Sequence, residues 1–130
     1  MIPWQEKYRG TKIYHMVYAE LIQVAQHRGT ITYQDIAVIA GLPTQGSYMG
    51  SELGKILGTI SQDEHDAGRP MLSAVVVHKD GTMGDGFFTF ARELGLIGPE
   101  DDEEAFLKAE REKVYQTWAR PIWVTKSGKD

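Results

Sequence analysis

Cysteine is absent from this sequence of 130 residues. Its absence excludes a disulfide framework, a thiolate metal site and a cysteine nucleophile. Long apolar runs are missing too. No run approaches the ~18 residues that a membrane-spanning helix needs, and the first residues lack the apolar core of a signal peptide. We therefore expect a cytoplasmic chain that has no contact with membranes.

An excess of basic residues is also missing. The chain has 14 Lys and Arg against 18 Asp and Glu, which gives a formal net charge of −4. DNA-binding domains usually concentrate Lys and Arg to neutralise several phosphates, so any positive patch here must be local. The 42% of apolar and 25% of charged residues are typical of a folded protein. We expect one domain over 1–130, with a core over 11–98 and a C-terminal helix and tail over 99–130.

Helical spacing of apolar residues predicts the first element. These residues recur at intervals of three and four over 11–28, and Gly29 follows as a stop signal. A short extended link is expected over 30–32. Thr32 and Asp35 then have the spacing of a capping box, which predicts the start of a second helix.

The next segment predicts a third helix. A break at 41–43 contains a glycine and a proline, and apolar residues then fit one helical face from about Thr44 to Ile60. Ser61 and Glu64 have capping-box spacing and predict a separate short acidic turn of helix after it.

The second half of the chain should contain one strand and two helices. The segment 71–78 is β-branched and nearly continuous in apolarity, which predicts a buried strand followed by a turn at 79–81. Three glycines over 81–86 indicate an irregular loop. A helical stripe starts at Phe87, and Pro99 with the acidic residues behind it predicts the start of a last helix.

Four glycines recur every four residues in the third predicted helix, at 46, 50, 54 and 58. Glycine inside a helix costs about 1 kcal/mol relative to alanine, so the row needs a reason. The first interpretation is tight packing against a neighbouring helix or strand. The second is close approach of a ligand or a phosphate backbone, with Ser47, Ser51 and Lys55 beside the row as donors.

The remaining candidates for chemistry do not form a catalytic or metal site. His65 lies among acidic neighbours, but consecutive helix positions point in different directions and do not converge on an ion. Ser73 has neither a nearby base in the sequence nor the glycine-flanked turn of a serine nucleophile. The glycines over 81–86 lack the spacing of a phosphate-binding loop. We therefore expect no enzyme activity, no metal and no cofactor.

Four segments in order carry a resemblance to a known family. Thr32-Tyr33-Gln34-Asp35-Ile36-Ala37 is similar to Ser-Tyr-Gly-Glu-Ile-Ala, and Gly46-Ser47-Tyr48-Met49-Gly50 begins a stretch similar to a recognition helix Ala-Arg-Ala-Val-Gly. Leu72-Ser73-Ala74-Val75-Val76 stands where the family has Pro-Cys-His-Arg-Val, and Gly84-Asp85-Gly86-Phe87 resembles its glycine-rich stretch. The family is that of the alkylguanine-DNA alkyltransferases, through their C-terminal domain, and their alkyltransferase-like relatives.

The resemblance implies an α+β, mostly α fold: a winged helix-turn-helix domain with an added C-terminal helix. The family binds DNA and turns a base into a pocket. In this chain Ser73 replaces the acceptor cysteine, and a serine hydroxyl cannot imitate a thiolate at neutral pH. Ser47 stands in place of the intercalating arginine, and Phe87 in place of the pocket tyrosine. Tyr33 is retained. The kinship requires Ser73 to lie beside the helix over 44–60.

The resulting expectation is a non-enzymatic winged-helix module that binds double-stranded DNA through the third helix and the turn after the strand. Seven residues would make the contacts: Tyr33, Gln45, Ser47, Tyr48, Ser51, Lys55 and Lys79. Ser73 and Phe87 would line the pocket. The alternative is a protein-interaction or regulatory domain on the same scaffold, which the negative charge and three candidate exposed tryptophans favour: Trp4, Trp118 and Trp123.

Overall fold

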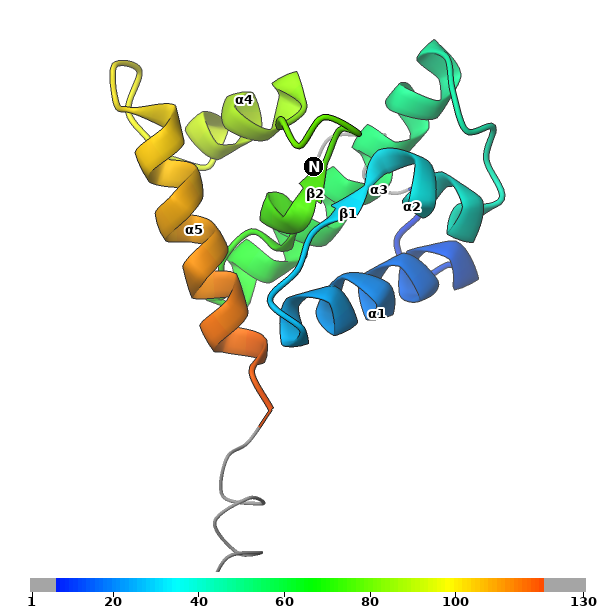
Figure 1. Ribbon diagram of the computed structural model, residues 1–130, viewed down its shortest axis with the longest axis horizontal. Helices are drawn as coiled ribbons and strands as arrows, with labels where there is room; N and C mark the ends of the chain where they lie inside the picture. The colour runs from blue at the N-terminus through cyan, green and yellow to red at the C-terminus, as the bar shows by residue number, and fades with distance from the viewer. Residues whose placement is uncertain (1–6, 121–130) are drawn as a thin grey trace, which may run out of the picture.

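The computed structural model describes residues 7–120. In chain order the elements are α1 (Lys12–Gln26), β1 (Ile31–Thr32), α2 (Tyr33–Ala40), α3 (Ser47–Asp66), the 3₁₀ helix η2 (Leu72–Val75), β2 (Val76–Val77), α4 (Asp85–Glu93) and α5 (Glu103–Trp118). Helices dominate, and the two short strands pair in parallel (Figure 1). The expected α+β class with mostly helical content is confirmed. No helix within 7–120 is long and apolar enough to cross a bilayer.

The first two helices begin within one residue of their predicted starts, and α1 ends at Gln26, two residues before the predicted Arg28. The Thr11 hydroxyl accepts a hydrogen bond from the N–H of Tyr14, and the Thr32 hydroxyl accepts one from the N–H of Asp35, both at 3.2 Å. These side chains satisfy N–H groups that the first turn of a helix leaves unpaired. α2 ends at Gly41, whose φ of 73° lies in the left-handed region.

The segment predicted as a long strand over 71–78 takes a different form. Leu72–Val75 is a 3₁₀ helix, and only Val76–Val77 is a strand, paired with Ile31–Thr32. The strand prediction is therefore wrong for most of the segment. The prediction of burial is correct for most of its residues, since Met71, Leu72 and Ala74 to Val77 are buried.

Side chains of helix α5 form hydrogen bonds with the backbone of this segment. The buried Glu110 carboxylate accepts a hydrogen bond from the N–H of Met71 at 2.8 Å, and Arg111 Nε donates to the carbonyl oxygen of Ala74 at 2.8 Å. Tyr115 also donates to the carbonyl oxygen of Gly29 at 2.8 Å. Because side chains satisfy these backbone groups, the segment is stable without a long strand partner.

Helix α3 is longer and starts later than predicted. It begins at Ser47 rather than near Thr44 and continues past Ile60 to Asp66, for 20 residues. The separate turn of helix predicted at Ser61 does not exist. The Ser61 hydroxyl is instead hydrogen-bonded to Ser73, so it is not free to cap a new helix.

The last two helices also start at other residues than predicted. α4 already begins at Asp85, so the loop expected over 81–86 is shorter. α5 begins at Glu103 and not near Pro99. Its first N–H groups are capped by the Asp102 carboxylate, which accepts from Glu104 N–H at 2.9 Å and from Ala105 N–H at 3.2 Å.

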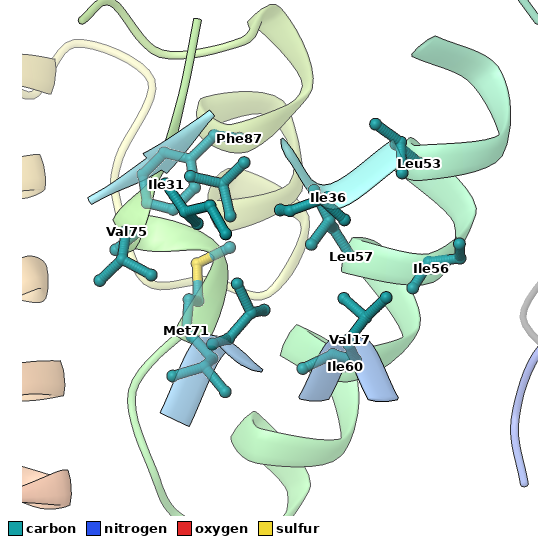
Figure 2. Close-up of a cluster of buried hydrophobic side chains, with 14 of the residues drawn as sticks. Val17, Ile31, Ile36, Leu53, Ile56, Leu57, Ile60, Met71, Val75 and Phe87 are labelled. Atoms are coloured by element: carbon teal, nitrogen blue, oxygen red, sulfur yellow. The ribbon is translucent and has the colours of Figure 1, made fainter. Parts of the chain in front are cut away.

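The core lies where α1, α2, α3 and η2 meet (Figures 1 and 2). Figure 2 shows Val17 of α1, Ile36 of α2 and Ile60 of α3 among the clustered side chains, and each is fully buried. Met71 joins the cluster from the start of η2, and Phe87 reaches it from α4. The core therefore fixes α3 and the segment that carries Ser73 against each other.

Of the three tryptophans, only Trp118 lies in the part of the chain that the structure describes. Trp118 is half-buried against the core, with the Arg69 guanidinium 5.4 Å from its ring centroid. Its expected exposure is therefore wrong, because α5 packs this face inward. Trp4 and Trp123 lie outside the described residues.

Candidate binding cavity between α3 and α4

A cavity of about 550 Å³ lies between α3 and α4. Ser73 of η2 and Met71 line it as well, together with Tyr33, His78 and Gly84 from the segments around the short sheet. This volume is within the range of small-molecule sites, which is ~300–1,000 Å³. The elements that line the cavity are those of the core, so their positions are set by packing.

The α3 wall of the cavity is formed by the glycine row. Gly50, Gly54 and Gly58 line it. A Cβ placed on Gly50 or Gly54 would meet no atom within 4 Å. The prediction that the glycines allow tight packing against a neighbouring element is therefore wrong at these two positions. They leave the backbone of α3 open toward the cavity.

Aromatic and sulfur-containing side chains form most of the remaining surface. Phe87 and Phe90 line the cavity from α4, and Tyr33 lines it from the start of α2. Met49, Leu57 and Met71 are also part of the apolar lining. Phe87 is buried, and its ring also packs against the Phe88 ring at a centroid distance of 5.1 Å. Such a surface binds flat apolar groups well.

Ser73 contributes a hydroxyl to the cavity, held in place by α3. The Ser61 hydroxyl donates to Ser73 Oγ at 2.7 Å and accepts from the Ser73 N–H at 3.2 Å. Within 7–120, no histidine or carboxylate is hydrogen-bonded to Ser73. Ser73 therefore lies beside the C-terminal half of α3.

Tyr33 packs directly over Gly84. A Cβ on Gly84 would lie 2.3 Å from the Tyr33 hydroxyl oxygen, so this approach requires glycine. Burial raises the pKa of Tyr33, which keeps the phenol protonated at neutral pH. The Tyr33 ring also lies 5.0 Å from the His78 ring, centroid to centroid. Both rings line the cavity, as does Gly84.

The predicted contact residues divide into groups. Gln45, Ser47, Tyr48 and Ser51 are all exposed at or just before the start of α3. Lys79 is exposed in a turn that the His78 N–H closes by donating to the Thr82 carbonyl oxygen at 2.8 Å. Tyr33, Ser73 and Phe87 line the cavity.

Lys55 is engaged by a carboxylate that sequence analysis did not single out. Glu52 is buried and accepts hydrogen bonds from Lys7 Nζ at 2.5 Å, Tyr8 Oη at 2.5 Å and Lys55 Nζ at 2.9 Å. These three donors lower the pKa of Glu52 to about 2. The sequence could have indicated this pair, because Glu52 precedes Lys55 by three positions on the same helix.

Two further carboxylates at the cavity were also missed. Asp85 and Glu93 line it from α4, and both residues are exposed. Their spacing of eight positions puts them on one face of the helix, which the sequence could have indicated.

No family model, no curated protein and no solved structure matches this chain.

Proposed function

We propose that this chain is a non-enzymatic DNA-binding module, in which α2 and α3 act as a helix-turn-helix and the turn over 78–82 takes the place of a wing. The proposal joins the resemblance to the alkyltransferase C-terminal domain with the geometry of α3. The residues that would contact DNA are those predicted: Tyr33, Gln45, Ser47, Tyr48, Ser51, Lys55 and Lys79.

The observation that carries the proposal is the open face at the N-terminal half of α3. Gly50 and Gly54 present bare backbone with no atom near their missing Cβ positions. Ser47 and Ser51 flank this face as exposed neutral donors. A duplex backbone can approach a helix most closely where side chains are absent, and hydroxyl groups donate to phosphate oxygens at that distance.

The beginning of α3 offers further donors. Gly46 at its N-cap gives no side-chain cap, so the first N–H groups of the helix are free to bind an anion. Tyr48 stands beside them with 57% of its surface exposed and could stack on a base or enter a base step. The negative net charge predicts weak ionic attraction, so shape and hydrogen bonding would supply most of the affinity.

The test is fluorescence anisotropy with a short labelled duplex at several salt concentrations. We expect micromolar binding and a shallow salt dependence, with log K falling by about 1–2 per tenfold rise in salt, since each phosphate contact contributes ~0.9. Ser47→Ala with Ser51→Ala should weaken binding, whereas Glu100→Gln, far from α3, should not. Absence of binding at micromolar protein, or binding with no salt dependence, would refute the proposal.

A second candidate is a protein-interaction role for the exposed apolar side chains of α2 and α3. Val38 of α2 is 67% exposed and Tyr48 of α3 is 57% exposed, and large apolar residues at such exposure are typical of protein contacts. Light scattering after size exclusion, with Val38→Ser as the variant, tests this candidate. A complex or dimer that Val38→Ser dissociates would support it, and a monomer that captures no partner would refute it.

A further inference from the structure

A buried carboxylate lies beside the proposed DNA-binding face of α3. Glu52 follows Tyr48 by four positions and precedes Lys55 by three, so the three residues share one side of the helix. Glu52 is buried, whereas Tyr48 is exposed. Burial of a charge is unfavourable unless the charge is paired, so the partners of Glu52 explain how it is tolerated.

Glu52 pairs with basic side chains from two segments. Lys7, before α1, donates to Glu52 Oε1 at 2.5 Å, and Lys55 of α3 donates to Glu52 Oε2 at 2.9 Å. The Tyr8 hydroxyl donates to the same oxygen as Lys7, also at 2.5 Å. These hydrogen bonds, that from Lys7 being the largest cause, lower the pKa of Glu52 to about 2. The carboxylate is therefore charged at neutral pH and binds both ammonium groups.

The two lysines carry positive charge that this side of α3 could offer to a phosphate backbone. Within α2 and α3, which the structure describes in full, Lys55 is the only Lys or Arg. The Lys7 side chain is 48% exposed and that of Lys55 is 31% exposed, so a polyanion in solution can reach both ammonium groups. Glu52 competes with such a polyanion for the two charges.

The contact between the segment before α1 and α3 does not in itself require a charged residue at position 52. Lys7 and Tyr8 donate to one and the same oxygen of Glu52, and the amide oxygen of a glutamine would accept from both. Only the second carboxylate oxygen, which accepts from Lys55, has no counterpart in glutamine. The feature that glutamate adds is therefore the hold on Lys55 and a stronger, ionic hold on Lys7.

We propose that Glu52 is an autoinhibitory residue of the α3 face: its carboxylate competes with phosphate groups for Lys7 and Lys55 and so limits the affinity of the chain for polyanions. The inference rests on the proposed function, because it concerns the same face of α3 and adds a control of its affinity. It assigns to Glu52 an effect on binding that is separate from its effect on stability.

The test measures the binding of Glu52→Gln to two polyanions. The salt concentration that elutes the chain from a heparin column reports on polyanions in general, and fluorescence anisotropy reports on a short labelled duplex. We expect Glu52→Gln to elute from heparin at higher salt and to bind the duplex about tenfold more tightly at low salt. The slope of log K against log salt should steepen by about 1–2, since up to two phosphate contacts are added.

Asp63→Asn is the matched control. Asp63 also lies on α3 and also pairs with the segment before α1, since it accepts from Arg9 Nη2 at 2.7 Å and from Arg9 Nε at 3.2 Å. It is about 16 Å from Glu52 along the helix axis. The variant removes the same charge from the same helix, so it reports the effect of net charge alone. It should change heparin elution and duplex affinity much less than Glu52→Gln does.

Lys55→Met connects the effect to one of the two ammonium groups. In the wild type it should weaken binding to heparin and duplex by less than about twofold, because Glu52 already holds Lys55. In the Glu52→Gln background it should weaken binding by at least about fivefold, because Lys55 is then available to phosphate or sulfate groups. Tyr8→Phe, which removes a donor to Glu52 but no charge, should leave heparin elution unchanged.

The proposal is overturned if Glu52→Gln elutes from heparin with the wild type, or if Asp63→Asn or Tyr8→Phe raises elution as much. Urea unfolding shows whether Glu52→Gln is folded. If it is not, Lys55→Met in the wild type decides, since a loss of about fivefold or more there would mean that Glu52 does not hold Lys55 back. If no variant binds the duplex but Glu52→Gln alone gains affinity for heparin, the proposed function fails and the inhibition by Glu52 stands.

Discussion

At the scale of single residues, Gly84 sets how closely two segments of the cavity approach. A Cβ at this position would lie 2.3 Å from the Tyr33 hydroxyl oxygen and 3.1 Å from the ring carbon that carries it. At Gly86, two residues further, a Cβ would meet nothing within 4 Å. The two glycines therefore form a natural pair for comparison.

Gly84→Ala should destabilise the fold by about 1–3 kcal/mol, the cost of overpacking, and Gly86→Ala should stay within about 0.5 kcal/mol of the wild type. Urea unfolding measures both. Tyr33→Phe, which removes the clashing oxygen, should recover part of the loss when combined with Gly84→Ala. Equal effects of the two alanine variants would contradict this account.

Glu52 should make stability dependent on acid pH. Its pKa is about 2 in the folded chain and 4.5 when unperturbed, so the ionised form stabilises the fold. This contribution is fully present above about pH 5 and is lost as the pH falls toward 2. The stability difference between wild type and Glu52→Gln should therefore shrink over this range in urea unfolding curves. A difference that stays constant, or that Glu100→Gln reproduces, would contradict the prediction.

At the scale of elements, the glycines of α3 lower its helix propensity, and the space around Gly50 and Gly54 is open. Gly50→Ala and Gly54→Ala should each stabilise the chain by up to about 1 kcal/mol, because helix propensity rises and no atom obstructs the new methyl group. Gly46→Ala should instead destabilise it, since Gly46 has φ of 95°. Thermal unfolding measures all three. A loss of stability in Gly54→Ala would mean that the face is not open.

The elements also show how much the sequence determines. α1 and α2 could be predicted because their signals are local: apolar residues recur at helical spacing over 11–28, and Thr32 caps the N–H of Asp35 three residues away. The segment from Met71 to Val75 could not, since Glu110 and Arg111, the partners of the Met71 N–H and the Ala74 carbonyl, lie far along the chain. Periodicity reports local preference and burial, but it does not report which distant side chain will satisfy a backbone group.

Only some of the residues that line the cavity could be predicted from the sequence. Ser73 and Phe87 were predicted as pocket residues through a resemblance, and both line the cavity. Asp85 and Glu93 were missed because acidic residues on a helix are usually solvated, and only the neighbouring elements reveal that they border a cavity. The pairing of Lys55 with Glu52 was missed too, although its spacing is local.

At the scale of the whole molecule, α5 supports the segment that carries Ser73. Arg111 donates to the Ala74 carbonyl oxygen at 2.8 Å and also contacts the sulfur of Met83. Because Ala74 is fully buried, removal of this donor leaves a carbonyl that water does not reach. The stability of the cavity thus depends on a helix that does not line it.

Arg111→Met should destabilise the chain by about 1–3 kcal/mol and should raise hydrogen exchange at Val76 and Val77. Lys113→Met, an exposed residue of the same helix, should have little effect. Urea unfolding and exchange measured by NMR test both expectations. Unchanged exchange at Val76 and Val77 in Arg111→Met would show that α5 does not support the segment.

The ring of donors around Glu52 has a consequence for selectivity. The Glu52 carboxylate pairs with the ammonium groups of Lys7 and Lys55, so these two charges are less available to a phosphate backbone. In the proposed contact with DNA, these two lysines would therefore add little ionic attraction, and the affinity would depend less on salt than the count of basic residues suggests.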